Sequence, residues 1–356
     1  MSKIIKRSKQ LALAILSTTS FYAPQIIALP YNYYQATRIG IADLYSYEIE
    51  LADINNNGTV VATANYDAYI YKNGVSTKIN NANQWTTDIH INDKDQVAGT
   101  ISLNKGFFYE DGSFQDIGNI LPIRINNDSK IIGKQNSQTV TYLNGTVATL
   151  DLPNGVTAVN SANNAAGTDA NGQAFTYING EKQIINKPPH VDWISIKAMN
   201  DENKVIGQLT ESKAFLIDND TITTFEPLET RNLSYLTDIN ANGTIVGTSY
   251  DRGYSCDHFS PECLLPNNFA AFMIEDGVIT NLTGRLLKQD AERGVKITKA
   301  LAINDFNFIV AQGFETGKGE AFYLLTPTPV PLPASAWLFL SGLSIFGALR
   351  RLARKV

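Results

Sequence analysis

Three aspartates of this chain have side chains that could perform chemistry. Asp53 and Asp238 each open an Asp-x-Asn-x-Asn-Gly segment, and Asp88 lies between them in the sequence. The two segments match the first half of a calcium-binding loop, but a complete EF-hand loop needs a glutamate at its twelfth position. Ala64 and Ser249 stand at those positions. We therefore expect tight polar turns, without a metal ion or another cofactor.

Other catalytic patterns are weak in this sequence. The three histidines, His90, His190 and His258, stand at unrelated points of the repeat, and none has a neighbour at the spacing of a metal-binding helix. No Gly-x-Ser-x-Gly turn that would hold a nucleophile occurs, and no glycine loop that would hold a phosphate. The sequence therefore favours a protein that is not an enzyme.

The two cysteines, Cys256 and Cys263, lie seven residues apart with His258 between them. In an exported chain, an even number of cysteines at short separation indicates a disulfide that closes a local loop. A metal site with His258 as third ligand is one alternative, but zinc needs four ligands and the sequence offers no second cluster. Free thiols are the other alternative. We predict the Cys256–Cys263 disulfide.

A recurring asparagine organises the elements that must position these residues. Apolar residues follow it five and six positions later, and Gly or Ala follows it seven positions later. The seven copies begin at Asn55, Asn92, Asn126, Asn160, Asn200, Asn240 and Asn304, at spacings of 37, 34, 34, 40, 40 and 64 residues. Seven such copies indicate a repeat architecture. We expect each asparagine to bond the backbone of its own turn, and the Gly or Ala to let the units approach one another closely.

Each copy continues with a second apolar run, a turn dipeptide and often a third run. The turns include Asn73-Gly74, Asp111-Gly112, Asn144-Gly145, Asn179-Gly180 and Asp276-Gly277. Asn-Gly and Asp-Gly between apolar runs are strong hairpin signals, because both central residues need positive φ. Each unit is therefore predicted to be an antiparallel meander of three or four strands.

Meanders of about 35–45 residues repeated seven times predict an all-β, seven-bladed β-propeller over residues 31–326. An open β-solenoid and an eight-bladed ring are the alternatives. The long spacing after Asn240 raises the possibility of an eighth blade, but we assign it to an insertion over residues 250–268. The last unit lacks an outer strand, and residues 34–40 form a run without a partner. We predict that residues 34–40 pair with residues 320–325 and close the ring.

In such a ring, Asp53, Asp88 and Asp238 precede the predicted inner strands and could meet at the axis. We expect solvated turns there. An enzyme would need a deep axial pocket with several convergent acids of shifted pKa, and a shallow or sealed axis would reject it.

Both ends of the chain carry export signals. Lys3, Lys6, Arg7 and Lys9 precede an apolar run, and Ala28 is a small residue that could end a signal peptide over residues 1–28. Residues 327–333 form a Pro-rich linker that ends in Val330, Pro331, Leu332 and Pro333. Residues 334–349 are almost entirely apolar, and residues 350–356 hold Arg350, Arg351, Arg354 and Lys355.

The apolar segment 334–349 is predicted to be a transmembrane helix. Its 16 residues span about 24 Å as a helix, so the flanking residues must cover the rest of a hydrocarbon core of about 30 Å. The basic cluster after it places the C-terminus in the cytoplasm. A buried helix of a soluble domain is the alternative.

The three-part C-terminus resembles the PEP-CTERM sorting signal of Gram-negative bacteria, here in a Val-Pro-Leu-Pro variant. The resemblance implies that an exosortase of the inner membrane removes the tail and passes the protein to the cell surface or extracellular matrix. The repeat resembles the HAF family of extracellular repeats, with Ile-Asn-x-x-Gly followed by Ala-Phe-x-Trp. Tyr109, Tyr142 and Tyr177 stand where that Trp is usual. This second resemblance implies a propeller and an extracellular location.

Charge excludes some partners. The chain has 29 Lys and Arg against 34 Asp and Glu, and eight of the basic residues lie in segments 1–28 and 334–356. The remaining body therefore has 21 basic and 34 acidic residues, a net charge of −13. Such a body disfavours nucleic acid and anionic lipid as partners. We expect a non-enzymatic surface or matrix module that binds a glycan, an exopolysaccharide or a protein; a secreted propeller hydrolase or lyase is the alternative.

Overall fold

The computed structural model describes residues 33–40, 51–64, 66–79, 85–101, 104–210, 213–219, 221–228, 231–251 and 269–328. All of them belong to the second of two compact units, which begins at Tyr33. Outside the described residues lie the predicted signal peptide with Ala28, the two cysteines, the Val330–Pro333 motif, the apolar segment 334–349 and the basic tail. Within the described ranges, no helix is long and apolar enough to cross a membrane.

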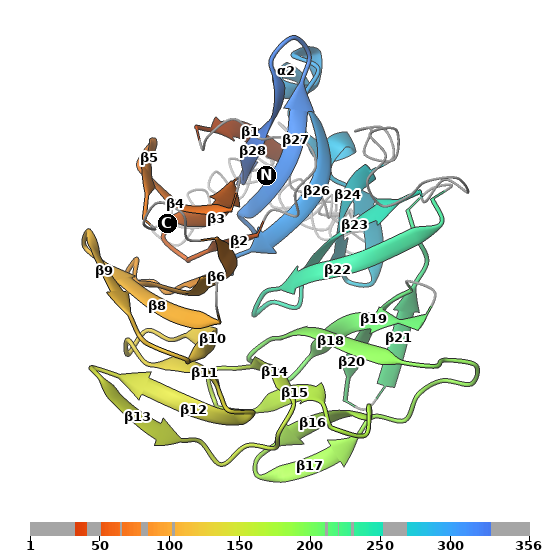
Figure 1. The fold of residues 1–356 in the computed structure, drawn as a ribbon. Coiled ribbons are helices and arrows are strands. Elements are labelled where there is room, and N and C mark those ends of the chain that lie inside the picture. The colour runs from red at the N-terminus through yellow and green to blue at the C-terminus, as the bar shows by residue number, and fades with distance from the viewer. Residues whose placement is uncertain are drawn as a thin grey trace, which may run out of the picture. The chain divides into compact units, whose positions relative to one another are not determined.

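The described residues form seven four-stranded antiparallel sheets around a common axis, which confirms the seven-bladed β-propeller (Figure 1). Blade 1 comprises β2 (Ala52–Ile54), β3 (Val60–Ala64), β4 (Asp67–Lys72) and β5 (Val75–Lys78). Blade 2 comprises β6 (Thr86–Ile91), β7 (Val97–Ile101), β8 (Lys105–Glu110) and β9 (Ser113–Asp116). Blade 3 comprises β10 (Leu121–Ile125), β11 (Ile131–Gln135), β12 (Gln138–Leu143) and β13 (Thr146–Thr149).

Blade 4 comprises β14 (Val156–Val159), β15 (Ala165–Thr168), β16 (Ala174–Ile178) and β17 (Glu181–Ile184). Blade 5 comprises β18 (Ile194–Met199), β19 (Val205–Leu209), β20 (Ala214–Asp218) and β21 (Thr221–Phe225). Blade 6 comprises β22 (Leu233–Ile239), β23 (Ile245–Tyr250), β24 (Phe269–Glu275) and β25 (Val278–Asn281). Blade 7 comprises β26 (Lys296–Ile303), β27 (Ile309–Glu315), β28 (Gly319–Thr328) and the N-terminal β1 (Tyr33–Ile39).

The long spacing after Asn240 is not an eighth blade. The predicted insertion joins β23 to β24 of the same sheet. A second part of the spacing was not predicted: a short 3₁₀ turn, η4 (Thr283–Arg285), and the helix α2 (Lys288–Glu292) connect blade 6 to blade 7.

Strand β1 closes the ring as predicted. It pairs antiparallel with β28, from Tyr33 opposite Thr328 to Ile39 opposite Phe322. Strand β28 therefore continues two residues into the predicted linker, where Pro327 lies opposite Tyr34.

The outer edge of β1 is covered by the α2 segment. The buried carboxylate of Asp290 accepts the N–H of Ala36 at 2.8 Å, and the N–H of Leu287 donates to the carbonyl of Tyr34 at 2.9 Å. Arg293 donates to the carbonyl of Ala36 at 3.3 Å. An exposed strand edge invites pairing with another chain, and these contacts occupy it.

The repeat asparagines hold their own turns, as predicted. In blade 7, Asn304 Oδ1 accepts the N–H groups of Phe306 and Phe308 at 3.0 and 2.9 Å. The side-chain amide has a second partner that the sequence did not indicate: Asn304 Nδ2 donates to the carbonyl of Asn55 in blade 1 at 2.9 Å. The same link joins blades 1 and 2, 2 and 3, 4 and 5, 5 and 6, and 6 and 7. We call the seven repeat asparagines the Asn belt.

The repeat glycines serve a different purpose from the one expected. In blades 3, 4, 5 and 6 they lie opposite a β-bulge in the inner strand of their own blade, as between Leu236 and Asp238 in β22. In blade 2 the bulge lies one residue pair away from Gly99. A Cβ on Gly247 would lie 2.5 Å from the carbonyl oxygen of Tyr235 and 2.6 Å from the ring of Phe272. The glycine therefore admits a buried phenylalanine beside a bulged strand within one blade, and it is not a contact between blades. Blade 7 also has a bulge at this position, but there the residue is Ala311 and it pairs with Tyr323.

We expect Gly247→Ala to lower the free energy of unfolding by about 2–4 kcal/mol, because backbone and a buried ring would have to move. The reverse change in blade 1, Ala62→Gly, is the matched control. Strand β2 pairs with β3 without a register shift, and Ala62 is accommodated there. That control should cost only about 1 kcal/mol. Urea denaturation of both variants measures the difference, and equal losses would contradict the bulge explanation.

Candidate functional site

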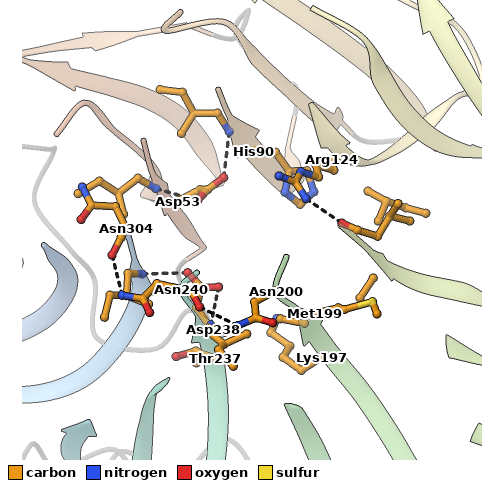
Figure 2. Close-up of a pocket in the computed structure, with 18 of the residues that line it drawn as sticks. Asp53, His90, Arg124, Lys197, Met199, Asn200, Thr237, Asp238, Asn240 and Asn304 are labelled. Atoms are coloured by element: carbon orange, nitrogen blue, oxygen red, sulfur yellow. Dashed lines mark hydrogen bonds between the residues drawn. The ribbon is translucent and has the colours of Figure 1, made fainter. Parts of the chain in front are cut away.

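The innermost strands β2, β6, β10, β14, β18, β22 and β26 surround a cavity of about 910 Å³ at the axis. All seven contribute to its wall, and Figure 2 shows lining side chains from several of them. The polar side chains in this wall come from different blades, so residues far apart in the sequence lie close together. In the Asn belt, for example, Asn304 bonds Asn55, which is 249 positions away. We call this cavity the axial pocket.

The position two residues before each repeat asparagine decides the chemistry of the axial pocket. Blades 1, 2, 3 and 6 carry charged or titratable residues there, and blades 4, 5 and 7 carry alanine. In ring order the residues are Asp53, His90, Arg124, Ala158, Ala198, Asp238 and Ala302. The wall is therefore chemically asymmetric, although the backbone repeats.

Asp53 and Asp238 each join two blades. Asp53 accepts the N–H of Ile54 at 2.8 Å with one carboxylate oxygen and the N–H of Ile91, in blade 2, at 2.9 Å with the other. Asp238 repeats the arrangement with Ile239 at 2.8 Å and with Ile303 of blade 7 at 2.9 Å. Both carboxylates are thus held rigidly by backbone amides (Figure 2).

The two carboxylates also influence each other. Burial, followed by the charge of Asp53, raises the pKa of Asp238 to about 7. Burial likewise raises the pKa of Asp53, against the opposing charges of His90 and Arg124. One proton near neutral pH therefore changes the charge of this wall.

His90 and Asp88 form a pair on the inner strand of blade 2, with 3.4 Å between His90 Nε2 and Asp88 Oδ1. Burial alone would lower the pKa of His90, but the charges of Asp88 and Asp53 outweigh it and raise the pKa. Burial alone would raise the pKa of Asp88, but the interaction with His90, the N–H of Ile89 and the charge of Lys197 together outweigh it and lower the pKa. Each partner therefore favours the charged form of the other, and both line the pocket.

Arg124 bridges blades 3 and 4. Its guanidinium donates to the carbonyl of Val159 at 3.1 Å and to Ser161 Oγ at 2.8 Å, and lies 3.7 Å from Asp201. Among the described residues, Asn126 Nδ2 donates no hydrogen bond to the carbonyl of Asn160, so the Asn belt does not join blades 3 and 4. The contacts of Arg124 lie at this junction. Arg124 is a structural cation.

The aspartates predicted to be candidate acids converge, but the expectation of solvated turns was wrong. Asp53, Asp88 and Asp238 lie within β2, β6 and β22 and line the axial pocket. His90 joins them, while His190 is exposed in the turn before β18 and His258 lies outside the described residues. Sequence reasoning missed Arg124 and Lys197. Aligning the seven copies and asking where they differ would have found both.

We expect the raised pKa of Asp238 to make stability fall as pH rises. The folded state binds its proton more tightly than the unfolded chain, so the stabilisation is complete below about pH 4 and is lost as pH rises through about 7. Because Asp238 is only partly buried and borders the open pocket, solvent screening limits the loss to about 2 kcal/mol.

Asp238→Asn isolates this effect, because the amide does not titrate. The variant should be destabilised at pH 5, since the N–H of Ile303 loses its acceptor, and the gap from the parent protein should narrow by pH 8. Thermal denaturation at both pH values measures it. A gap that stays constant would contradict the assignment to Asp238.

The comparisons with known proteins agree with the propeller fold and assign the chain to no family. No family model matches this chain, and no curated protein matches it. Among solved structures, virginiamycin B lyase from Staphylococcus aureus aligns with a TM-score of 0.54 at 12% identity, over 83% of this chain and 99% of that one. YCF48 bound to D1 peptide aligns with a TM-score of 0.54 at 10% identity, over 84% and 96%.

An extracellular domain from B. thetaiotaomicron, assigned to a hybrid two-component system, aligns with a TM-score of 0.53 at 13% identity. It covers 84% of this chain and 40% of that one. At these identities the likeness concerns the propeller fold alone.

Proposed function

We propose that this protein is an exported, non-enzymatic binding module whose axial pocket receives a hydroxyl-rich ligand, a glycan of the cell surface or matrix. One observation carries the proposal: an axial pocket of about 910 Å³ with polar groups from several blades. Ligand sites in proteins are concave and fix orientation with a few convergent polar groups. Carboxylates held by backbone amides, as at Asp53 and Asp238, can accept further bonds from hydroxyl groups.

The binding test uses the propeller, residues 29–333, and a panel of neutral, acidic and amino oligosaccharides. Isothermal titration calorimetry should detect at least one class, and the axial variant Ala198→Trp should abolish that binding by filling the pocket. Binding unaffected by Ala198→Trp would place the ligand elsewhere, and no binding to any class would overturn the glycan proposal.

A hydrolase or lyase is the second candidate, and a specific observation favours it. The pocket with convergent acids that an enzyme requires is present, and the pKa of Asp238 near 7 suits a group that exchanges protons at neutral pH. Binding is the better-supported function because Asp53 and Asp238 commit both carboxylate oxygens to backbone amides. Product analysis of bound oligosaccharides decides: cleavage that Asp238→Asn removes would establish the enzyme.

The route to the surface is a separate proposal, which rests on the resemblances of the termini and repeats. After removal of a signal peptide at Ala28, the segment 334–349 anchors the chain in the inner membrane of a Gram-negative bacterium. An exosortase then recognises Val330–Pro333 and releases the PEP-CTERM protein, with its HAF-type repeats, to the surface or matrix. Fractionation of full-length and tail-truncated protein, with and without exosortase, tests it. Equal distribution in all cases would defeat it.

A further inference from the structure

Lys197 departs from the repeat at a position that faces the axial pocket. It stands three residues before Asn200, in the bulge of β18 between Ile196 and Ala198. The equivalent residues of blades 4 and 6 are threonines that bond the next inner strand. Thr237 Oγ1 donates to the carbonyl of Ala300 at 2.8 Å, and Thr157 Oγ1 lies 3.5 Å from the carbonyl of Ile196. Lysine cannot reproduce this short bond.

The ammonium of Lys197 has no fixed partner among the described residues, in which it forms neither an ion pair nor a hydrogen bond. Its side chain is exposed, although it belongs to an innermost strand, because it borders the open pocket (Figure 2). The other cation of this part of the wall, Arg124, is committed to Val159 and Ser161. A further lysine of the lining, Lys299, lies with its ammonium 5.4 Å from the ring centroid of Phe269. Lys197 therefore differs from both in having no such partner among the described residues, and it is available to a ligand.

The wall beside Lys197 leaves room for a ligand. Ala158 and Ala198 stand where blades 1, 2, 3 and 6 carry long or charged side chains. Ser195 and Gln208, paired in register on β18 and β19, add a hydroxyl and an amide to the same side of the pocket. A ring-sized ligand can lie against Ala198, which is only partly buried, and bond these polar groups.

Blades 1 and 6 offer acceptors, and β22 of blade 6 is the direct neighbour of β18, which carries Lys197. Asp53 and Asp238 keep lone pairs free beyond their bonds to backbone amides, and they suit hydroxyl donors. A ligand that binds both the lysine and the aspartates carries an anionic group for Lys197 and hydroxyl groups for Asp53 and Asp238. We propose that the axial pocket binds an acidic sugar, a ring with a carboxylate and several hydroxyls, with the carboxylate on Lys197 Nζ. This rests on the proposed glycan function and names its ligand class.

The test compares three probes of equal length: an oligouronate, the corresponding neutral oligosaccharide and the corresponding amino-sugar oligosaccharide. Lys197→Thr supplies the residue that blades 4 and 6 carry, so the inner strand should stay intact. Lys94→Thr removes one positive charge at an exposed turn outside the pocket and is the matched control. Thermal denaturation checks that both variants are folded.

We expect the parent protein to prefer the oligouronate. Lys197→Thr should weaken oligouronate binding at least about tenfold, consistent with a charge-assisted contact, and should leave neutral-sugar binding within about twofold. Lys94→Thr should leave both unchanged. High salt should weaken the oligouronate selectively.

Three results would overturn the inference. The first is equal weakening of the binding of all probes by Lys197→Thr, and the second is no effect of Lys197→Thr on oligouronate binding. The third is a preference for the amino-sugar oligosaccharide, which would show that the carboxylates of the pocket select the ligand. Each leaves the glycan proposal standing. Absence of binding to every probe overturns both, so the two failures are distinguishable.

Discussion

Deletion of residues 31–42 is expected to destabilise the entire ring and not only one of its ends. Strand β1 completes blade 7, and without it β28 becomes an open edge that carries Phe322 and Leu325, both fully buried in the intact protein. The deletion also removes the buried side chains of Tyr34 and Ile39. Each contributes about 1.5–3 kcal/mol when fully buried. We expect a loss of about 5 kcal/mol or more, measured as a large fall of a single thermal transition.

A neighbouring pair of tyrosines provides the matched control for this closure. Tyr34 is 0% exposed and its hydroxyl points to Met273 in blade 6, whereas Tyr33 is 51% exposed. Tyr34→Ala should lower the free energy of unfolding by about 3–5 kcal/mol, and Tyr33→Ala by less than about 0.5 kcal/mol. An unchanged melting transition after the deletion, or equal effects of the two substitutions, would refute closure by β1.

The architecture of this protein was predictable because its signals are local and repeated. Asn73-Gly74 and its counterparts adopt positive φ at both residues, as hairpin turns require. Each of the seven asparagines accepts the N–H four residues later in its own turn and, among the described residues, all but Asn240 also accept the N–H two residues later, a range that a sequence motif encodes. Closure by β1 was predictable from a missing strand at one end of the chain and a spare strand at the other.

What could not be predicted depends on contacts between distant residues. The bulge between Leu236 and Asp238 has no local turn signal, yet it explains Gly247. Asp290 accepts a hydrogen bond from the N–H of Ala36, 254 positions away. The sequence of α2 therefore did not indicate that this helix helps to close the ring. The raised pKa of Asp238 depends first on burial in the ring and then on the charge of Asp53, from five blades earlier in the chain. Convergence at the axis is a property of the ring, and no segment carries it alone.

A second large effect on stability is expected in the Asn belt, where most asparagines bond the next blade and Asn126, among the described residues, does not. Asn240 Nδ2 donates to the carbonyl of Asn304 at 3.0 Å and to Asn307 Oδ1 at 2.7 Å, and the residue is buried. Asn126 is half-buried, and only its turn bonds, to the N–H groups of Asp128 and Lys130, are present among the described residues. Replacement by aspartate keeps the acceptor for the turn in both and removes the donor.

We expect Asn240→Asp to lower the free energy of unfolding by about 3 kcal/mol at pH 7, because a buried carboxylate would face two oxygens. Asn126→Asp should cost about 0.5 kcal/mol or less, since Arg124 already spans that junction to Val159 and Ser161. Urea denaturation at pH 7 and pH 4 measures both. The deficit of Asn240→Asp should shrink at pH 4, where a protonated carboxyl can donate again. Equal costs for the two variants at pH 7 would show that the amide links between blades do not stabilise the ring, and that the turn bonds alone account for the recurrence of asparagine.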